Sequence, residues 1–542
     1  MSEPLLDVRE LAVTFAAEEG PPVAAVRGVS LTVAPGEVVA LVGESGCGKS
    51  VTALALTGLL GTGAAQIAGS ARYDGRELVG APDHDLRALR GAEIAMVFQD
   101  PLSSLNPVVR VGDQIAEQIR AHGPAGRREA LERAAALLDD VGVEPGAERS
   151  RAFPHELSGG MRQRAMIAMA LSCAPRLLIA DEPTTALDVT VQAQVLALIG
   201  QLRERTGAGV LLITHDFGVV AELADRVAVM RDGRIVEQGG VEEVFDAPAD
   251  PYTRALIDAV PSIGGPPRAP LADRAPLLEL ERIDVAYGAR RGLVGRRAGR
   301  RAVDGATLSV AAGETVALVG ESGSGKSTLA RAAARLLVPD GGRIAFAGQD
   351  FTRARRRGLA PLRRDLQIVF QDPYGSLNPR RRVGASVALA LRLRGVGRDR
   401  AERRVGELLE RVGLEAGHAG RWPHELSGGQ RQRVGIARAL AGDPRLVILD
   451  EPLSALDVTV RGQILELLDG LQREHGIAYL LISHDLAVVR QVAHRVAVMH
   501  GGRIVETGSA AEILAAPADP FTAQLLAAVP AAHPRDRAAV RR

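Results

Sequence analysis

Two short glycine-rich segments carry the most readily interpreted chemistry in this chain. Residues 43–50 and 320–327 both read Gly-Glu-Ser-Gly-X-Gly-Lys-Ser, where X is Cys47 or Ser324. Glycines allow backbone N–H groups to turn inward around phosphate oxygens, and the helix-forming run after each segment adds its positive N-terminal end. A glycine-rich turn could produce one such segment. Two copies at matching positions predict a pair of phosphate-binding loops, or P-loops.

Lysine is confined to these loops. The chain has 66 basic residues, of which only Lys49 and Lys326 are lysine. A compact ammonium suits the β- and γ-phosphates of a nucleotide better than the broad guanidinium fork, which explains why lysine is kept here. Ser50 and Ser327 follow directly and are predicted Mg²⁺ ligands. The loop residues expected to bind nucleotide are Gly43, Ser45, Gly46, Cys47, Gly48, Lys49, Ser50 and Val51, and Gly320, Ser322, Gly323, Ser324, Gly325, Lys326, Ser327 and Thr328.

An Asp-Glu pair ends a short apolar run in each half of the chain. The pairs are Asp181-Glu182 and Asp450-Glu451. Ligands of open α/β sheets bind at the carboxyl ends of the strands, which is where these carboxylates would lie. The Asp is predicted to hold Mg²⁺ and the Glu to polarise an attacking water. A helix cap or loop role is the alternative for an isolated pair, and the P-loops argue against it.

A Leu-Ser-Gly-Gly segment precedes a long helical run in each half. Serine followed by two glycines at a helix start makes an anion site, although such a segment standing alone is more often only a cap. The residues concerned are Ser158, Gly159 and Gly160, and Ser427, Gly428 and Gly429.

The chain is a tandem duplication. The Leu-Ser-Gly-Gly, Asp-Glu-Pro and His-Asp segments each recur 269 residues later. A Pro- and Gly-rich stretch, residues 261–276, separates the copies and predicts a linker between domains 1–260 and 277–542. Short apolar runs without alternation predict buried strands, and amphipathic stretches between them predict helices, which together indicate an α/β domain. Residues 100–155 lack strand-like runs and predict a separate helical subdomain.

The amino-acid composition limits which classes of protein this chain can belong to. The 542 residues are 46% hydrophobic and 24% charged, with a formal net charge of +1, which indicates globular domains and gives no charge bias toward nucleic acid. Two cysteines cannot supply a disulfide framework or a four-ligand metal site. No segment reaches the 18 uninterrupted apolar residues of a membrane helix, so we expect a soluble chain, which could still dock on a membrane protein.

Together these motifs resemble the ATP-binding subunits of ABC transporters, twice over. The resemblance implies two tandem P-loop NTPase domains of ABC type, each with a RecA-like α/β core, an antiparallel β subdomain and an α-helical signature subdomain. It also implies ATP and Mg²⁺ as ligands. The further matching segments are the glutamine loops at Gln99 and Gln371, the D-loops Thr185-Ala186-Leu187-Asp188 and Ser454-Ala455-Leu456-Asp457, and the switch histidines His215 and His484.

The family implies a head-to-tail sandwich in which each ATP lies between the P-loop of one half and the Leu-Ser-Gly-Gly segment of the other, which is called the signature. The glutamines would assist catalysis and bind Mg²⁺, while each switch histidine would contact the γ-phosphate rather than serve as a structural residue. Phe15 and Tyr287 lie where the family places an aromatic ring against adenine, although each could equally be a core residue. One site would combine Lys49, Ser50, Gln99, Asp181, Glu182 and His215 with Ser427 and Gly429, and the other Lys326, Ser327, Gln371, Asp450, Glu451 and His484 with Ser158 and Gly160.

Further segments resemble the dipeptide, oligopeptide and nickel importer branch with its two ATPases fused. They are Gln99 to Pro107, Gln371 to Pro379, Pro154-His155-Glu156-Leu157 and Pro251-Tyr252-Thr253. This branch implies two permease subunits, an extracytoplasmic solute-binding protein and a peripheral position on the cytoplasmic face of the bacterial plasma membrane. In this branch, the segment after the glutamine loop faces the permease.

The cargo stays open at this point. Peptides are the family-level expectation, and nickel, glutathione or another small solute are alternatives. A soluble ABC protein without a transport role, such as a ribosome-associated factor, is the competing class, but its long charged linker is missing here. The arginine-rich stretch 289–301 could suggest nucleic acid or lipid, although a solvated loop insertion explains it more simply.

Overall fold

The computed structural model divides the chain into two compact units. Unit 1 comprises Met1–Val260 with Pro530–Arg542, and unit 2 comprises Pro261–Val529. Residues 261–276, the predicted linker, therefore group with unit 2, and residues 530–542, expected in the second domain, group with unit 1. The structure describes residues 3–16, 21–61, 63, 65–99, 104–184, 187–259, 268–269, 271, 274–288, 300–371, 373–453, 456, 458–530 and 533–537.

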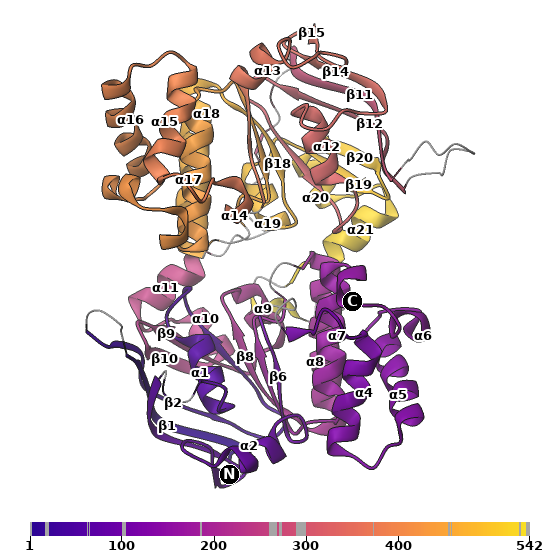
Figure 1. The fold of residues 1–542 in the computed structure, drawn as a ribbon, viewed down its shortest axis with the longest axis vertical. Coiled ribbons are helices and arrows are strands. Elements are labelled where there is room, and N and C mark those ends of the chain that lie inside the picture. The colour runs from indigo at the N-terminus through magenta and orange to yellow at the C-terminus, as the bar shows by residue number, and fades with distance from the viewer. Residues whose placement is uncertain are drawn as a thin grey trace. The chain divides into compact units, whose positions relative to one another are not determined.

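The core of unit 1 is a six-stranded sheet in the order β10-β9-β3-β8-β7-β6 (Figure 1). All neighbouring pairs are parallel except β10 with β9. Every residue of β3, β7 and β8 is buried, as apolar runs covered on both faces should be. A four-stranded antiparallel sheet has the order β2-β1-β4-β5. The strands are β1 Leu6–Phe15, β2 Val23–Val33, β3 Val38–Val42, β4 Ala65–Tyr73, β5 Arg76–Glu77, β6 Ile94–Val97, β7 Leu177–Asp181, β8 Gly209–Thr214, β9 Arg226–Arg231 and β10 Arg234–Gly240.

A helical subdomain of unit 1 packs around its own small core. Ile115 and Ile119 from α4 meet Leu138 from α5 and Ala165 from α7, all of them buried. The helical region expected within residues 100–155 is thus present, and α7 completes it. The α-helices are α1 Lys49–Leu56, α2 Asp83–Leu89, α4 Val111–His122, α5 Arg127–Asp140, α6 Gly146–Arg149, α7 Gly159–Leu171, α8 Val189–Thr206, α9 Phe217–Leu223, α10 Val241–Asp246 and α11 Pro251–Asp258; the 3-10 helices are η1 Pro154–Glu156 and, from the C-terminal segment, η4 Pro534–Asp536.

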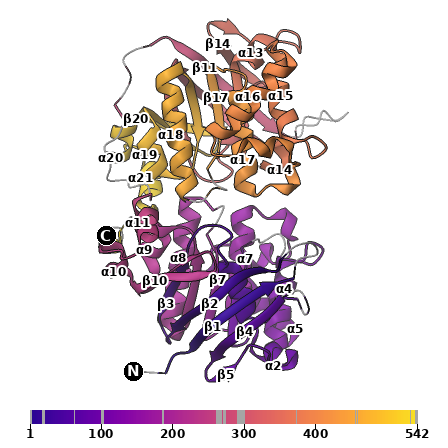
Figure 2. The ribbon, with the colours of Figure 1, turned by 90° about the vertical axis from the view of Figure 1, so that its left-hand side faces the viewer.

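Unit 2 repeats this architecture (Figure 2). Its sheets have the orders β16-β17-β18-β13-β19-β20 and β12-β11-β14-β15. The strands are β11 Pro276–Tyr287, β12 Arg300–Ala311, β13 Thr315–Val319, β14 Gly341–Phe346, β15 Gln349–Asp350, β16 Leu366–Val369, β17 Leu446–Asp450, β18 Ala478–Ile482, β19 Arg495–His500 and β20 Arg503–Ser509. The helices are α12 Lys326–Ala333, α13 Ala360–Asp365, α14 Pro373–Ser376, α15 Val383–Leu393, α16 Arg398–Arg411, η2 Ala416–Gly420, η3 Pro423–Glu425, α17 Gly428–Leu440, α18 Val458–His475, α19 Leu486–Val492, α20 Ala510–Ala515 and α21 Pro520–Ala527.

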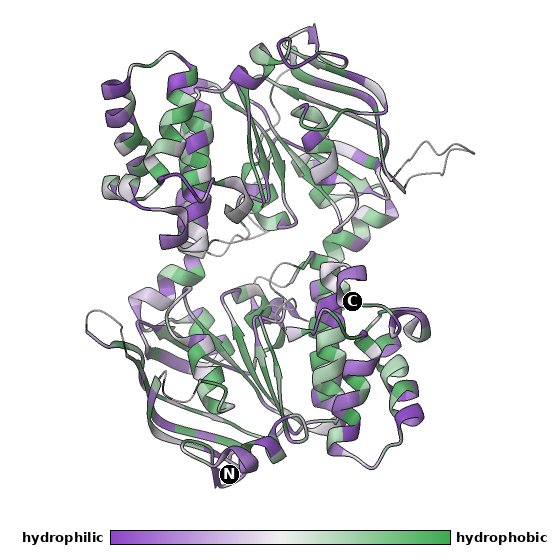
Figure 3. Cartoon of the chain, in the orientation of Figure 1, coloured by the Kyte–Doolittle hydropathy of each residue, from purple (hydrophilic) through white to green (hydrophobic). Residues whose placement is uncertain are grey.

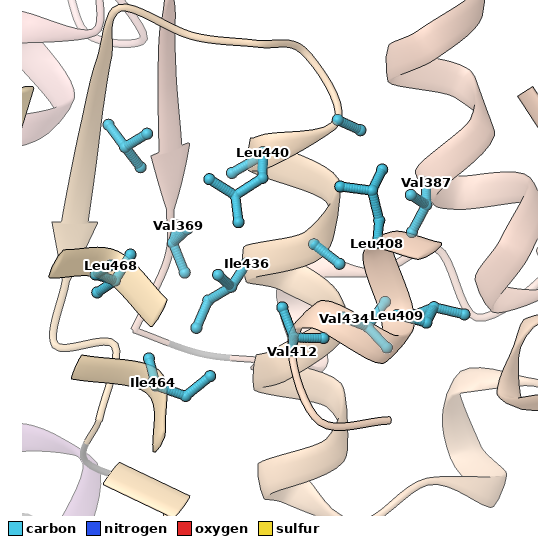
Figure 4. Packing of buried hydrophobic residues seen from close by; sticks show 14 of the residues in the cluster. Val369, Val387, Leu408, Leu409, Val412, Val434, Ile436, Leu440, Ile464 and Leu468 are labelled. Atoms are coloured by element: carbon cyan, nitrogen blue, oxygen red, sulfur yellow. The ribbon is translucent and has the colours of Figure 1, made fainter. Parts of the chain in front are cut away.

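Apolar packing joins the parts of each unit. Figure 3 shows hydrophobic residues concentrated on the central strands and on the helix faces turned toward them. In unit 2, Val387 of α15, Leu408 of α16 and Ile436 of α17 belong to the same buried cluster as Leu468 of α18 and Val369 of β16 (Figure 4). The helical subdomain is therefore packed onto the α/β core that carries the P-loop. Among the described helices, none combines the length and hydropathy that a membrane crossing requires.

Candidate functional site

Each P-loop connects a buried strand to a helix that begins at its lysine. In the first loop, Gly43 and Gly48 have φ angles of 154° and 108°, and a Cβ on Gly48 would lie 2.4 Å from the Ala25 carbonyl oxygen. Both positions therefore require glycine. A Cβ on Gly46 would meet nothing within 4 Å, so the loop is open at its middle. The second loop repeats this geometry with positive φ angles at Gly320, Gly323 and Gly325.

The two lysines are buried in their loops. Lys49 is 5% exposed, and its Nζ donates to the carbonyl oxygens of Gly43 at 2.8 Å and Glu44 at 2.9 Å. Lys326 makes the equivalent two hydrogen bonds, both at 2.7 Å. The ammonium is thus fixed inside the loop, and a bulkier guanidinium would displace the backbone that holds it.

The variable position of the loop is also buried. The Cys47 side chain is 8% exposed, and burial raises the pKa of its thiol despite the nearby Lys49 charge. The equivalent Ser324 is 6% exposed, and its Oγ has no hydrogen-bond partner in the part of the chain that the structure describes. A buried hydroxyl without a partner in an open glycine loop fits a phosphate oxygen as its missing acceptor.

A serine hydroxyl and a strand-end carboxylate meet in each half. Ser50 Oγ donates to Asp181 Oδ1 at 3.1 Å, and Ser327 Oγ donates to Asp450 Oδ1 at 2.8 Å. Burial raises the pKa of Asp181 to about 6, partly offset by the Ser50 hydrogen bond, and it raises the pKa of Asp450 as well. Hydroxyl and carboxylate oxygens are the donors that a hard cation such as Mg²⁺ prefers, so these residues fit that ion.

Glu182 is held by the other two predicted catalytic residues of its half. Gln99 Nε2 donates to Glu182 Oε2 at 2.7 Å, and His215 Nδ1 lies 3.2 Å from Glu182 Oε1. The glutamate has a φ of 49°, in the left-handed region that non-glycine residues seldom adopt. This backbone turn, together with the two contacts, fixes the carboxylate at the carboxyl edge of the sheet.

Glu451 has the same arrangement in unit 2. Gln371 Nε2 donates to Glu451 Oε2 at 2.6 Å, His484 Nδ1 lies 3.6 Å from Oε1, and the φ of Glu451 is 47°. Burial by itself would raise the pKa of Glu451. The adjacent His484, aided by the Lys326 charge and the glutamine amide, outweighs burial, so this pKa lies below its ordinary value.

The signature serines cap the helices that follow them. Ser158 Oγ accepts from Met161 N at 3.3 Å at the start of α7, and Ser427 Oγ accepts from Gln430 N at 3.2 Å at the start of α17. Gln430 Oε1 also accepts from Ser427 N at 3.1 Å, which completes a capping box. The glycines that follow, Gly159, Gly160, Gly428 and Gly429, form the first turns of these helices.

The two predicted adenine-facing aromatics differ in their surroundings. Phe15 is half-buried at the end of β1 and packs against the core of unit 1. Tyr287 is 45% exposed, and its hydroxyl lies 3.4 Å from Thr328 Oγ1 on the P-loop helix. Tyr287 therefore contacts a residue expected to bind nucleotide, whereas Phe15 has a larger share in the core.

Within each half, the serine after the lysine contacts the strand-end Asp, and the Glu contacts the predicted glutamine and histidine. Ser45, Gly46 and Cys47 lie in the first loop and Ser322, Gly323 and Ser324 in the second, while Val51 and Thr328 lie in the first turns of α1 and α12. The D-loop residues Thr185, Ala186, Ser454, Ala455 and Asp457, and residues 289–299 of the arginine-rich stretch, lie outside the described residues.

Tyr252 supports the first P-loop, a role that the sequence did not indicate. Its hydroxyl accepts from the loop amide of Glu44 at 3.3 Å, and Arg231 lies over the Tyr252 ring with its guanidinium carbon 4.8 Å from the ring centroid. The repeated Pro-Tyr-Thr segment suggests the importer branch. It gives no signal of this contact, because the loop lies 208 positions earlier in the chain.

These features define a class of protein. A P-loop joined to strand-end Asp and Glu residues, with a hydroxyl beside the Asp and a histidine beside the Glu, is the site of a nucleoside triphosphate hydrolase. A sequence profile described as "ABC transporter" matches residues 26–185 and 303–454. A second, described as "Oligopeptide/dipeptide transporter, C-terminal region", matches residues 236–286 and 505–542.

Two individual proteins and one solved structure are similar to this chain. The glutathione import ATP-binding protein GsiA of Salmonella typhimurium is 50% identical over 565 residues, covering 98% of this chain and 90% of that protein. The GsiA protein of Escherichia coli strain K12 is 49% identical over 567 residues with the same coverage. A dimeric ADP- and Pi-bound structure of the cassette MJ0796 is 30% identical, with a TM-score of 0.39 over 43% of this chain and 98% of that one. The chain belongs to the ATP-binding proteins of ABC transporters, and it hydrolyses ATP.

Proposed function

We propose that this chain supplies both ATPase domains of an importer for short peptides, with glutathione as the first cargo to test. The observation that best supports this proposal is that 98% of the chain aligns with a glutathione import ATP-binding protein at 50% identity. The match to the oligopeptide/dipeptide C-terminal region in both halves supports the peptide class. The proposed domains are residues 1–260 and 277–542, joined through residues 261–276.

The proposed partners are two permease subunits in the bacterial plasma membrane and an extracytoplasmic solute-binding protein. The chain would act as a peripheral subunit on the cytoplasmic face. Its net charge of +1 gives no general attraction to nucleic acid. The segments after Gln99 and Gln371, which resemble the permease-facing segments of the importer branch, favour permeases as the partners.

The proposed ATP sites are composite, with the P-loop of one half facing the signature helix of the other. Ser158 and Ser427 begin helices whose free N–H groups and positive dipole ends attract a terminal phosphate. Such an attraction lasts only while the γ-phosphate is present. Hydrolysis would therefore release the halves and drive the transport cycle.

Within each site, the residues have distinct proposed tasks. Lys49 and Lys326 neutralise the β- and γ-phosphates, and Ser50 with Asp181, or Ser327 with Asp450, would hold Mg²⁺, which neutralises developing phosphate charge when bound. Glu182 and Glu451 orient the attacking water and accept its proton. Gln99 and His215, or Gln371 and His484, hold these carboxylates in place, as their contacts in the structure support.

The proposal is tested by uptake in cells deleted for this gene. Radiolabelled glutathione, a dipeptide and Ni²⁺ are supplied in parallel to cells that carry the wild-type chain or the Glu182→Gln plus Glu451→Gln variant. Glu132→Gln plus Glu402→Gln, at exposed positions on α5 and α16, is the matched control.

We expect the wild type and the control, but not the catalytic variant, to restore glutathione or dipeptide uptake and to co-purify with two permeases. If only Ni²⁺ uptake were restored, the cargo would be nickel and not a peptide. Co-sedimentation with ribosomes without any uptake would overturn the importer role.

A further inference from the structure

Each ABC domain is followed by a short segment that groups with the other unit. Residues 261–276 follow α11 of the first domain and belong to unit 2, whereas residues 530–542 follow α21 of the second domain and belong to unit 1. We call these segments the linker arm and the tail arm. The helices α9 and α19, which begin two residues after the switch histidines, are called the switch helices. We infer that the arms form an equivalent pair, each of which follows one ABC domain and stabilises the switch helix of the other.

The linker arm docks in unit 2 through Arg268. Its Nη1 donates to Gln472 Oε1 at 2.6 Å and to the Val492 carbonyl oxygen at 3.3 Å, and its guanidinium pairs with Asp469. Val492 is the last residue of the switch helix α19. The Arg268 side chain is only 22% exposed, so the arm inserts this charge into the packing between α18 and α19.

The tail arm docks at the same place in unit 1 through Arg537. Its guanidinium donates to the carbonyl oxygens of Ala221 and Ala224 at the end of the switch helix α9. Arg537 stands 269 residues after Arg268, the same spacing that separates the two copies of the Leu-Ser-Gly-Gly, Asp-Glu-Pro and His-Asp segments. Equivalent arginines therefore bind the carboxyl ends of equivalent helices.

At each docking site, the N–H donors of an arginine guanidinium meet the C-terminus of a helix. The last carbonyl groups of a helix have no partners within it and carry partial negative charge, and a guanidinium can satisfy them while complementing the dipole. The fork geometry allows one arginine to reach two acceptors, which a lysine ammonium cannot do with equal rigidity.

The remaining contacts hold the two arms by different means. The tail arm has an additional anchor at Asp246, which pairs with Arg535 and lies 3.2 Å from His533 Nε2. The His533 ring also meets Phe245 edge-on, with 5.7 Å between centroids. Asp469 and Asp246 align with Gly200 and Ala515, so each carboxylate exists in one half only. Each arm therefore has its own anchoring carboxylate, while the arginine at the helix end is common to both.

The position of the docking sites gives the arms their proposed task. Asp216 and Asp485 cap the first turns of the switch helices, directly after the switch histidines, and the arms bind the opposite ends of the same helices. The arms thus hold each switch helix at its far end. Because each arm follows one ABC domain in the chain, the switch helix of each unit is held by a segment whose sequence continues from the other domain.

Hydrogen–deuterium exchange on the full chain without nucleotide tests the assignment. Arg537→Met removes the donors of the tail arm, and Arg268→Met removes those of the linker arm. Arg400→Met, at an exposed position on α16, is the matched control. We expect Arg537→Met to speed exchange about three- to tenfold in residues 217–225 and to leave residues 486–494 unchanged, with the converse for Arg268→Met. Faster exchange only in the switch helix of the domain that the arm follows, or no change in either helix, would overturn the inference.

A cross-linking experiment tests whether the tail arm docks within its own chain. In a Cys47→Ser, Cys173→Ser background, Asp246→Cys and His533→Cys are combined and treated with a short bismaleimide; each single-cysteine variant is a control. We expect a cross-linked peptide within one chain in the double variant only. Cross-linked dimers would show that tails are exchanged between chains and would overturn the pairing within one chain. Neither readout needs transport or ATP turnover, so failure here is distinguishable from failure of the importer proposal.

Discussion

The two units place the same proposed catalytic groups in slightly different contacts. In both units a glutamine donates to the proposed catalytic glutamate, at 2.7 Å in unit 1 and 2.6 Å in unit 2, and both glutamates have a left-handed backbone. The histidine approaches the glutamate more closely in unit 1, at 3.2 Å against 3.6 Å. The same residues in nearly the same contacts argue that both halves are built for hydrolysis.

Support of the P-loop differs more clearly between the units. Unit 1 has the Tyr252 hydroxyl on the loop amide of Glu44, while Phe521 occupies the equivalent position in unit 2 and has no hydroxyl. The cation–π contact of Arg231 with Tyr252 is matched in unit 2 by His500, whose ring centroid lies 4.0 Å from that of Phe521. The first loop is therefore supported by a hydrogen bond from outside the loop, whereas unit 2 has packing between two rings at the equivalent position.

The signature helices differ in their caps. Ser427 and Gln430 form a reciprocal pair of hydrogen bonds, whereas the Met161 side chain has no oxygen with which to return a bond to the Ser158 amide. If the composite sites are formed as proposed, the fully capped helix serves the first P-loop and the half-capped helix serves the second. The proposed composite sites would then differ in the capping of the signature helix that each contains.

The largest expected effect comes from replacing both P-loop lysines. Lys49→Arg plus Lys326→Arg should lower ATP turnover by about 100-fold or more. The bulkier guanidinium does not fit the buried loop, so its donors would miss the transferred phosphate that the lysine ammonium is proposed to contact. Steady-state ATPase assays measure this loss, and circular dichroism checks that the fold is intact. Turnover within a few-fold of wild type would contradict the proposed role of these two lysines.

The equality of the two sites is tested by removing one catalytic carboxylate at a time. Glu182→Gln and Glu451→Gln should each lower hydrolysis at its own site by about 100-fold or more, since each takes away the group that we propose accepts the water proton. We expect the two single variants to have equal residual turnover in steady-state assays. A difference larger than about threefold would show that one site dominates hydrolysis despite the matching contacts.

Much of this arrangement could be predicted from the sequence because its signals are local. Fully buried strands such as Val38–Val42 read as unbroken apolar runs, and the P-loop glycines are required by backbone angles that few other residues tolerate. The apolar spacing of Ile115 and Ile119 indicates the helical subdomain. Duplication reinforces these signals, since each motif occurs twice in register.

Other features depend on contacts between residues distant in sequence and have no local signal. The Tyr252 hydroxyl meets a loop amide 208 positions away, and Arg537 meets an acceptor on α9 that is 316 positions away. The left-handed backbone of Glu182 and Glu451 is imposed by the surrounding sheet edge, because glutamate has no intrinsic preference for it. The grouping of the arms likewise follows from packing that composition alone does not reveal.

The buried carboxylates beside the P-loops make stability depend on pH. Burial raises the pKa of Asp181 to about 6, above its unfolded value of about 3.9. Between these values the folded state binds more protons, so this group makes the free energy of unfolding fall as pH rises. Asp181→Asn should therefore stabilise the metal-free protein by about 1–2 kcal/mol at pH 8, with little gain at pH 4.

Calorimetry at the two pH values measures this effect, and Asp450→Asn should act in the same direction. Added Mg²⁺ and ATP should reverse the order of stabilities, because the ionised carboxylate is then needed. A lower melting temperature of Asp181→Asn at pH 8 without metal would contradict the assigned cost of burying this charge.

The smallest expected effect comes from exchanging the capping residues of the two signature helices, Met161 and Gln430. Met161→Gln should stabilise the start of α7 by about 0.5–1 kcal/mol by adding the return hydrogen bond to the Ser158 amide, and Gln430→Met should destabilise the start of α17 by a similar amount. Met161 is half-buried against the core of the helical subdomain, so part of the gain is offset by burying an amide. Met161→Leu keeps the apolar contact without the acceptor and separates the two contributions. Exchange rates of the first-turn amides measure the change, and equal protection in Met161→Gln and Met161→Leu would show that packing, not the missing hydrogen bond, distinguishes the two signature helices.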